Sequence, residues 1–492
     1  MATLIRIHSL VLLAVTLHAS AIQAQQADSA KNDPREQPAT PYPAGRTLFP
    51  TILSPGSTSD SDLDISQAPT AEVQLEADRR PLSGVQELTV GSNVGVRNFL
   101  VPSVNVMSSM AMNSSVSGLD RPTTFSDLLG TLDLNHVSDR SKILLHYTGG
   151  GMISSYVNSA IQDLEFSYNF AWRRWSLLVG DQVSYLSESP FGFGGVGGLA
   201  FLNGGSQFGP GGVPGPFLNA SLTPNQTIPT IMVPRLSNTV VSQLEYNLSP
   251  RSSWTASGSF GILNFLGAPY INSTQGQFQT GYNYLVSPQS SIAVIYRFDA
   301  FRFTYLPQSI EDHVVQLGYG RYVTGRMSFQ LAAGPSMEML RGVVTGYGNR
   351  LSWALESLLN YRLDRTTLSL AYDHVLTGGS GVLVGAQTGQ LEGTVERELT
   401  PRWRGSATMA YATNGSLLQT TANSGAGQLN SWYVAIQLNR QLRPRTFFFV
   451  SYGARVQAIN AAACATPNCG TSSIGHEVSA GFNFGLRPIL FR

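Results

Sequence analysis

Apolar and polar side chains alternate along most of this chain, and residues 351–376 show the pattern most clearly. Trp353, Leu355, Leu359 and Tyr361 stand at alternate positions, with mostly small or polar residues between them. Because a β-strand points alternate side chains to opposite faces, each arm of this stretch has one apolar and one polar face. The polar residues 364–367 join the two arms and are too few for anything but an antiparallel hairpin.

The same hairpin unit recurs from Asn98 onward. Tight turns rich in Pro, Ser, Thr, Asp and Arg are predicted near 138–141, 173–174, 249–252, 287–290, 324–326, 364–367, 400–402 and 443–446. Between them lie nine generally longer connections, near 113–123, 149–157, 188–235, 264–274, 304–312, 335–348, 377–388, 413–426 and 458–473. Seventeen connections predict eighteen strands, with both ends of the barrel segment on the short-turn side.

This alternation of tight turns and longer loops is typical of outer-membrane barrels, whose turns face the periplasm. In lipid, only helices and closed sheets satisfy every backbone polar group. A soluble β-sandwich or propeller is the alternative, but eighteen successive strands near the length that crosses a bilayer favour a lipid-facing wall. We therefore predict an all-β fold, a transmembrane antiparallel β-barrel of about 18 strands over residues 98–492.

One strand departs from the regular pattern. In residues 175–186, Asp181 shares a face with Val179 and Val183. A carboxylate on an apolar face predicts a β-bulge or a local turn that brings Asp181 inward.

Residues 1–97 differ from the barrel segment. Residues 1–24 combine an early positive charge, an apolar run and small residues near Ala21 and Ala24, which predicts a secretory signal peptide. Residues 25–97 hold eight prolines among Ser, Asp, Gln and Thr without periodicity, which predicts a flexible periplasmic arm. An arm that plugs the barrel or contacts peptidoglycan is the alternative.

The last strand carries a second signal. Ser479, Gly481, Phe484 and Leu486 stand at fixed offsets. This pattern resembles the insertion signal on the last strand of bacterial outer-membrane barrels, which the barrel assembly machinery reads. Members of that class usually end on this strand with an aromatic residue, whereas this chain continues to Arg492. The resemblance is one of class, and it implies an outer-membrane location with lipid and the assembly machinery as partners.

Composition narrows the functional classes. Charged residues make up only 12% of the chain, and 31 basic residues nearly balance 30 acidic ones, so nucleic acid is not expected as a partner. Cys464 and Cys469 would meet an oxidising compartment and are predicted to form a disulfide; half of a metal site is the less favoured alternative. No metal or cofactor is predicted.

The connection 188–235 is the longest of the chain. It holds many glycines and prolines, and by strand count it is the third external loop. In general porins the third loop folds into the barrel and narrows it, so this likeness implies a constriction; a loop exposed on the surface is an equal alternative. The candidate constriction residues are Phe191, Phe193, Phe201, Phe208 and Phe217.

Charged residues on the polar face predict the lining of a lumen. They are Lys142, Asp163, Glu165, Glu245, Arg297, Asp299, Arg302, Glu356, Arg362, Asp373, Glu392, Glu396, Arg404, Arg455 and Glu477. In a barrel of this size wall side chains alone do not fill the interior, which favours a polar channel. The alternative is a network of paired charges that fills the interior without a path. The mixed signs predict no strong preference for anions or cations.

An enzyme is not predicted. Asp312–His313 and Asp373–His374 are sequence neighbours, so in a strand their side chains point to opposite faces, and no nucleophile motif accompanies them or His146. We expect an outer-membrane channel for passive or weakly selective diffusion of small polar solutes or saccharides. The alternative is a plugged barrel that serves as a surface anchor or interaction protein, including one that accompanies polysaccharide export. The sequence gives no oligomeric state.

Overall fold

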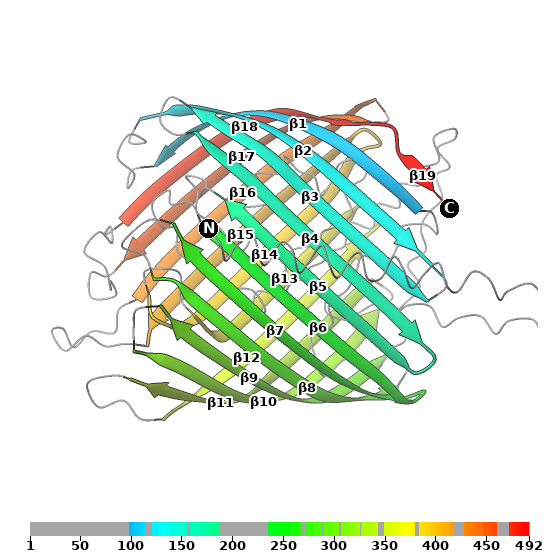
Figure 1. Cartoon of the computed structure of the whole chain (residues 1–492), viewed down its shortest axis with the longest axis vertical. Coiled ribbons are helices and arrows are strands. Elements are labelled where there is room, and N and C mark those ends of the chain that lie inside the picture. The colour runs from blue at the N-terminus through cyan, green and yellow to red at the C-terminus, as the bar shows by residue number, and fades with distance from the viewer. Residues whose placement is uncertain are drawn as a thin grey trace, which may run out of the picture. The chain divides into compact units, whose positions relative to one another are not determined.

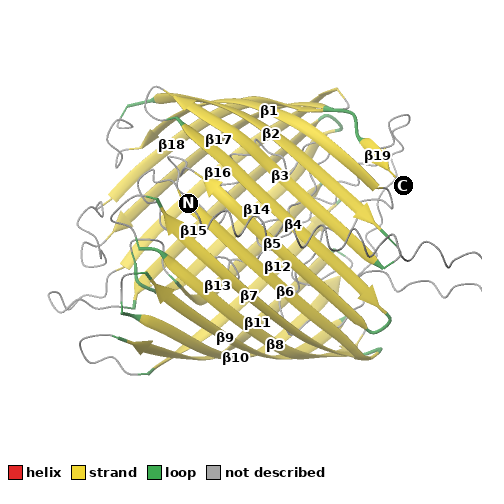
Figure 2. Cartoon of the chain, in the orientation of Figure 1, coloured by secondary structure: helices red, strands yellow, loops and turns green. Residues whose placement is uncertain are grey.

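The structure is a computed structural model of the chain, and it describes one extended sheet. The described residues run from 98 to 491, without 114–120, 139, 155–157, 187–234, 267–270, 288, 305–306, 325, 343–348, 379–382, 418–427, 444 and 460–471. Figures 1 and 2 show that this part of the chain consists of long tilted strands and short connections. The described residues contain no helix that is long and apolar enough to cross a membrane.

Eighteen long strands and one short strand form the sheet. Their bounds are β1 (Asn98–Asn113), β2 (Thr123–Val137), β3 (Ser141–Ser154), β4 (Ser159–Trp172), β5 (Trp175–Leu186), β6 (Arg235–Ser249), β7 (Ser252–Phe265), β8 (Ser273–Ser287), β9 (Ser290–Phe303), β10 (Ser309–Thr324), β11 (Met327–Arg341), β12 (Arg350–Leu363), β13 (Thr366–Thr377), β14 (Ala386–Thr400), β15 (Trp403–Ser416), β16 (Gln428–Arg443), β17 (Thr446–Ile459), β18 (Ser472–Gly485) and β19 (Ile489–Phe491). The lengths of 12 to 16 residues for the long strands exceed the minimum for crossing a bilayer at a tilt.

The sheet closes on itself. Each long strand pairs antiparallel with its neighbours in sequence, and β1 pairs with β2 on one side and with β18 on the other. A closed sheet leaves no edge strand with unpaired backbone groups, which is the condition for a sheet in lipid. The predicted antiparallel β-barrel of about 18 strands is confirmed.

The connections alternate in length as the sequence indicates. Eight connections, beginning with β2–β3 and ending with β16–β17, are two or three residues long. The nine others range from four residues to the 48 residues between β5 and β6. The barrel therefore has a short-turn end and a long-loop end.

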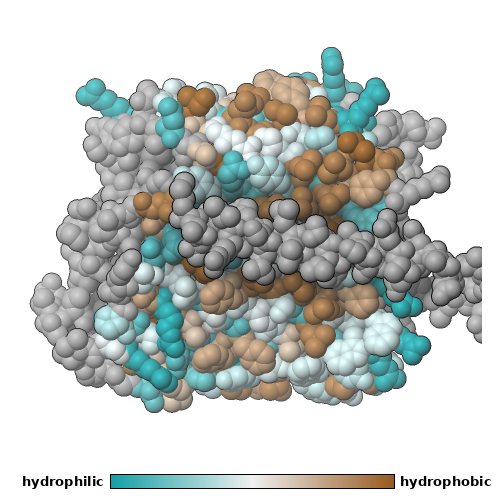
Figure 3. Space-filling view, in the orientation of Figure 1, coloured by the Kyte–Doolittle hydropathy of each residue, from teal (hydrophilic) through white to brown (hydrophobic). Residues whose placement is uncertain are grey.

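The two faces of the wall have opposite character. Leu317 (69% exposed) and Leu128 (58% exposed) are typical of the apolar side chains on the outer face, whereas Asn135, Ser253 and other polar side chains are buried on the inner face. Figure 3 shows apolar side chains spread over the outer surface of the wall. Tryptophan and tyrosine gather near the short-turn end, where the ring of Trp175 lies 4.3 Å from that of Tyr246. An apolar band bordered by an aromatic girdle is the surface of a transmembrane barrel.

The prediction of a bulge or inward turn in β5 is wrong. Asp181 pairs in unbroken register with Phe166 of β4 and Val240 of β6, so its side chain stays on the outer face. The side-chain amide of Asn238 donates a hydrogen bond of 2.7 Å to the Asp181 carboxylate. A hydrogen bond from a neighbouring side chain, rather than a change in the backbone, therefore accommodates the Asp181 carboxylate on the outer face.

This lipid-facing polar pair costs stability, which gives a first prediction. Replacing both partners, Asp181→Val with Asn238→Val, is expected to raise the free energy of unfolding by about 1–3 kcal/mol, because a carboxylate in the apolar band is destabilising. Urea titration in lipid vesicles measures this change. Asp181→Asn serves as the control that keeps a polar pair. A loss of stability in the double variant would contradict the assignment of this face to lipid.

The last strand is longer than its sequence pattern indicates. After β18, the chain passes Arg487 and Pro488 and pairs again with β1 through β19, where Phe491 lies opposite Asn98. The chain therefore reaches an aromatic residue at the end of its last paired segment. Whether the residues Ser479, Gly481, Phe484 and Leu486 signal insertion stays a prediction.

Gly481 has a packing role of its own. A Cβ added to this residue would stand 2.5 Å from the carbonyl oxygen of Val106 and 2.6 Å from the ring of Phe449, which is itself buried against the lumen side. We expect Gly481→Val to destabilise the barrel by about 2 kcal/mol or more, because the clash involves backbone and a fixed ring. The paired variant Gly481→Val with Phe449→Ala is expected to recover part of the loss, and urea unfolding measures both.

Candidate functional site

The candidate site is the inner face of the barrel. Ten carboxylates are buried among the described residues, against three arginines. The buried carboxylates are Asp127, Asp133, Asp163, Glu245, Asp299, Asp312, Glu338, Glu356, Glu392 and Glu477, and the arginines are Arg235, Arg297 and Arg455. The inner face therefore carries an excess of acidic groups, which the mixed signs in the sequence did not indicate.

Most of the sequence-predicted lumen charges lie on inward positions, and one does not. The strand alternation places Lys142, Arg362, Asp373, Glu396 and Arg404 on the inner face with the buried residues above. Arg302 shares the face of Ile292 and Val294, and its side chain is 54% exposed. The lumen assignment of Arg302 is therefore wrong. Four buried carboxylates on inward positions are absent from the sequence-predicted lumen charges, namely Asp127, Asp133, Asp312 and Glu338.

Arg302 belongs to a small ionic cluster on the outer face. It lies 3.2 Å from a carboxylate oxygen of Glu311 on β10, and Arg341 on β11 lies 2.8 Å from the other oxygen. Both arginines are more than half exposed at the long-loop end. The sequence could not show this, because the polar pattern at a strand end does not distinguish the two faces.

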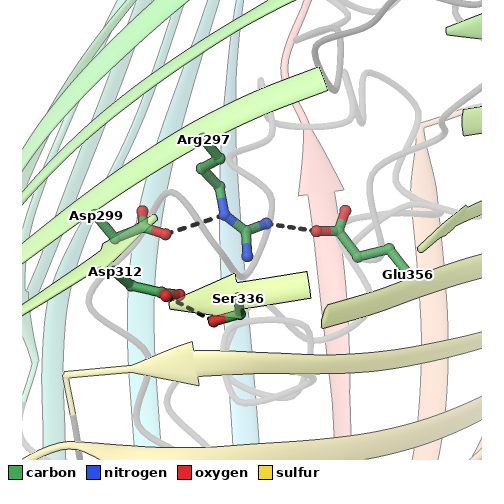
Figure 4. Close-up of polar contacts among 5 residues, drawn as sticks. All are labelled: Arg297, Asp299, Asp312, Ser336 and Glu356. Carbon is green, nitrogen blue, oxygen red and sulfur yellow. Dashed lines mark hydrogen bonds and ion pairs between the residues drawn. The ribbon is translucent and has the colours of Figure 1, made fainter. Parts of the chain in front are cut away.

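Arg297 lies among inward carboxylates on β9 to β13, which we call the acidic wall (Figure 4). Its Nε donates to Asp299 at 3.0 Å, and its Nη1 donates to Glu356 on β12 at 2.5 Å. Its side chain is only 2% exposed, so the guanidinium reaches Glu356 along the inner surface of β10 and β11 rather than through the lumen. Small residues at inward positions there, such as Ala332 and Gly334, leave room for it.

Carboxylates stand directly opposite one another on neighbouring strands around Arg297. Asp299 pairs in register with Asp312, and Asp312 pairs with Glu338. Glu356 pairs with Asp373. Ser336 donates a hydrogen bond of 2.6 Å to Asp312 (Figure 4). Arg350 lies 3.8 Å from Glu338, so two guanidinium groups, those of Arg297 and Arg350, stand beside five acids. Like charges in opposing positions are destabilising, so this arrangement indicates a role other than stability.

A second acidic patch lies on β2–β5. His146 contacts Asp133 through Nδ1 at 2.5 Å and Thr148 through Nε2 at 3.1 Å. Gln182 donates to Glu165 at 3.0 Å. Because β3 and β12 are nine strands apart in a ring of eighteen, this patch and the carboxylates around Arg297 lie on opposite sides of the barrel, with this patch nearer the short-turn end.

Residues 383–385, which lead into β14, pack against the inner face of the barrel. Leu383 and Val384 are buried, and Val384 belongs to an apolar cluster with the inward side chains Phe301 and Ile310 of β9 and β10. A Cβ at Gly378 would meet the ring of Phe301, and one at Gly385 would meet Ile310. Gly385 also has a positive φ of 68°, which favours glycine. We call Gly378 and residues 383–385 the inner cap.

The inner cap lies directly beside the acidic wall. Phe301 and Ile310, which it covers, are each two residues from Asp299 and Asp312 on the same inner face. An apolar cluster therefore lies beside a row of carboxylates at the long-loop end. The sequence signal for this inward packing is the apolar pair Leu383 and Val384 within a glycine-rich connection. A loop exposed to water would not need two apolar side chains there.

Other predicted sites lie outside the described residues or away from the lumen. Phe191, Phe193, Phe201, Phe208 and Phe217 of the predicted constriction, and the predicted disulfide partners Cys464 and Cys469, lie outside the described residues, so both sites stay predictions. His313 and His374 point to the outer face, away from Asp312 and Asp373, and the ring of His374 stacks on Trp353 at 3.8 Å. Neither Asp–His dipeptide forms a catalytic pair.

These features define the class of protein. The chain forms a closed eighteen-stranded antiparallel barrel with an apolar outer band, an aromatic girdle and a polar interior, which is the architecture of transmembrane, porin-like barrels. The class resemblance that the sequence indicates is confirmed.

Comparisons with known proteins add the following. No protein-family model matches the chain, and no curated protein matches it in sequence. Solved structures that are similar include three outer-membrane proteins of Pseudomonas aeruginosa. OccK2 (OpdF) is 9% identical over 79% of this chain and 98% of its own, with a TM-score of 0.41. OprD is 9% identical over 81% and 99%, with a TM-score of 0.41, and OpdQ is 10% identical over 79% and 99%, with a TM-score of 0.42. At this degree of similarity, the solutes of those proteins are not assigned to this chain.

Proposed function

We propose that this protein is an outer-membrane channel for the passive diffusion of small polar solutes, with a preference for cations. The observation that carries the proposal is the excess of buried carboxylates over arginines on the inner face. Rings of acidic side chains favour cations in pores. In this proposal the long-loop end faces outside, and residues 25–97 lie in the periplasm after removal of residues 1–24.

Two features support a water-filled path. A barrel of eighteen strands has an interior wider than its wall side chains fill. Carboxylates such as Asp312 and Glu338 stand opposite one another, and a cation that binds or passes beside them would offset their repulsion. The two acidic patches on opposite sides of the barrel would then contact a solute from both sides.

The inner cap supports a second candidate. Leu383 and Val384 pack against the inner wall, so a barrel closed at the long-loop end would serve as an anchor or an interaction protein rather than as a channel. The described residues of the inner cap contact inward side chains of β9 and β10, so this part of the connection covers one sector of the circumference. This partial cover favours the channel over the plugged barrel.

Solute entry into proteoliposomes tests the proposal. Liposomes that contain the refolded protein are expected to swell in an uncharged pentose. Under a KCl gradient, the same liposomes are expected to develop a diffusion potential of the sign that denotes cation preference, which a voltage-sensitive dye reports. A triple variant, Asp312→Asn with Glu338→Gln and Asp373→Asn, is expected to reduce the measured preference for the cation over the anion. Arg302→Gln, on the outer face, is the control and should leave it unchanged. Liposomes that contain the folded protein but neither swell nor develop a potential would favour the plugged barrel.

A further inference from the structure

Basic residues are distributed very unevenly between the two ends of the barrel. The chain has 31 basic residues, of which only Lys31 and Lys142 are lysines. The eight short turns comprise 17 residues and hold eight arginines, whereas the nine longer connections comprise 112 residues and hold only Arg121. Turn geometry does not require arginine, since Ser, Asp, Asn, Gly and Pro serve turns better. The arginines of the short turns therefore need another explanation.

These arginines surround the barrel. Every short turn except β8–β9 holds at least one arginine, and Arg321, on the outer face of β10, pairs in register with Ser290 just after that turn. Among the described residues of these turns, Asp364 is the only acidic one, and it lies 3.0 Å from Arg326. The result is a band of positive charge at the short-turn end, which we call the arginine ring. It consists of Arg140, Arg173, Arg174, Arg251, Arg321, Arg326, Arg365, Arg402 and Arg445.

The arginine ring lies at the boundary of the apolar band. Leu363 (42% exposed) and Leu399 (48% exposed) occupy outward positions two or three residues before Arg365 and Arg402. Arg440 faces outward as well, and its guanidinium lies 5.2 Å from the centre of the Trp403 ring in the girdle. Charges at this level meet lipid headgroups, because apolar residues and interfacial tryptophan come immediately next to them.

We propose that the arginine ring binds the phosphate groups of anionic phospholipids in the leaflet at the short-turn end. A guanidinium matches a phosphate with two parallel hydrogen bonds, which an ammonium does not, and this explains the choice of arginine over lysine. A band around the whole circumference fits an occupant that surrounds the barrel. A protein or cell-wall partner that docks from one side would need one patch only.

The tryptophans of the chain provide the measurement. Trp172, Trp175, Trp254 and Trp403 lie at the short-turn end, so brominated lipids that gather there quench their fluorescence. In phosphatidylcholine vesicles, brominated phosphatidylglycerol is expected to quench the wild type with a relative association constant roughly fivefold that of brominated phosphatidylcholine. Salt at 0.5 M should reduce the preference, since exposed charges are screened.

Variants separate the ring from general charge effects. A variant in which Arg251, Arg365, Arg402 and Arg445 are replaced by Gln is expected to lower the ratio to roughly half of the wild-type value, because the other arginines of the ring remain. The matched control replaces Arg121, Arg302, Arg341 and Arg350 at the long-loop end by Gln and should keep the wild-type ratio. Heat-modifiable mobility on gels shows that each variant is folded, and only folded protein enters the comparison.

Three results would overturn the proposal. They are a ratio near one for the folded wild type, a ratio unchanged in the ring variant, and an equal loss in the control variant. If the wild type shows no lipid preference but is retained by isolated peptidoglycan through the same arginines, the ring is a cell-wall contact instead. None of these outcomes depends on whether the barrel conducts.

Discussion

Removal of Leu383 and Val384 from the inner cap is expected to raise the single-channel conductance by roughly twofold or more, because the conductance of a pore depends on its narrowest section. Deletion of residues 379–384 leaves Gly378 and Gly385 between Thr377 and Ala386, which already face each other in the register of β13 and β14. A two-residue Gly-Gly turn suits a hairpin of this kind, so the deletion keeps the strands paired. The structural reason for the effect is the loss of Leu383 and Val384 from the inner wall beside Phe301.

The control deletes residues 115–120 from the β1–β2 connection, which also belongs to the long-loop end. This deletion removes no residue of the apolar cluster around Val384. Its conductance should equal that of the wild type within the spread of the channels. An inner-cap deletion that folds and conducts as the wild type does would show that the narrowest section lies elsewhere. Residues 188–235 would then be the remaining prediction for it.

Loss of Arg297 is expected to cause the largest loss of stability from a single substitution in the wall. Arg297→Met leaves Asp299 and Glu356 without their shared guanidinium at positions that are almost completely buried. Breaking a buried ion pair by removing one partner costs about 3–5 kcal/mol. Urea unfolding in lipid vesicles measures the change in the free energy of unfolding.

Two further variants test the cause of that loss. Arg297→Met combined with Asp299→Asn and Glu356→Gln removes the unpaired charges and should recover most of the stability. Arg302→Met removes an arginine that is half exposed on the outer face, where a surface ion pair contributes about 1 kcal/mol or less. Equal losses for Arg297→Met and Arg302→Met would contradict the central position of Arg297.

The sequence predicts the wall of the barrel well because a lipid-facing strand carries its information locally. Alternation along β12, with Trp353 and Leu355 outward and Glu356 inward, is visible in the sequence because adjacent side chains face different media. The same rule explains why His313 and His374 lie away from Asp312 and Asp373. Turn chemistry gives the connections, so the strand number follows by counting.

The features that sequence could not predict depend on contacts between distant strands. Asp181 departs from the alternation, and its stabilising partner Asn238 is 57 residues away, beyond the longest connection. The inner cap joins β13–β14 to β9–β10 through Phe301 and Ile310, a contact that alternation does not indicate. The excess of carboxylates over arginines on the inner face could not be counted from the sequence either. The count depends on which face of the wall each charged side chain occupies.

Planar-bilayer recording of the refolded chain tests the central proposal most directly. The proposal predicts discrete single-channel steps in symmetrical KCl and, in a tenfold KCl gradient, a reversal potential of the sign that denotes cation preference. Asp312→Asn with Glu338→Gln should move that potential toward zero. A folded barrel that inserts into the bilayer and passes no current, before and after deletion of residues 379–384, would contradict the channel function.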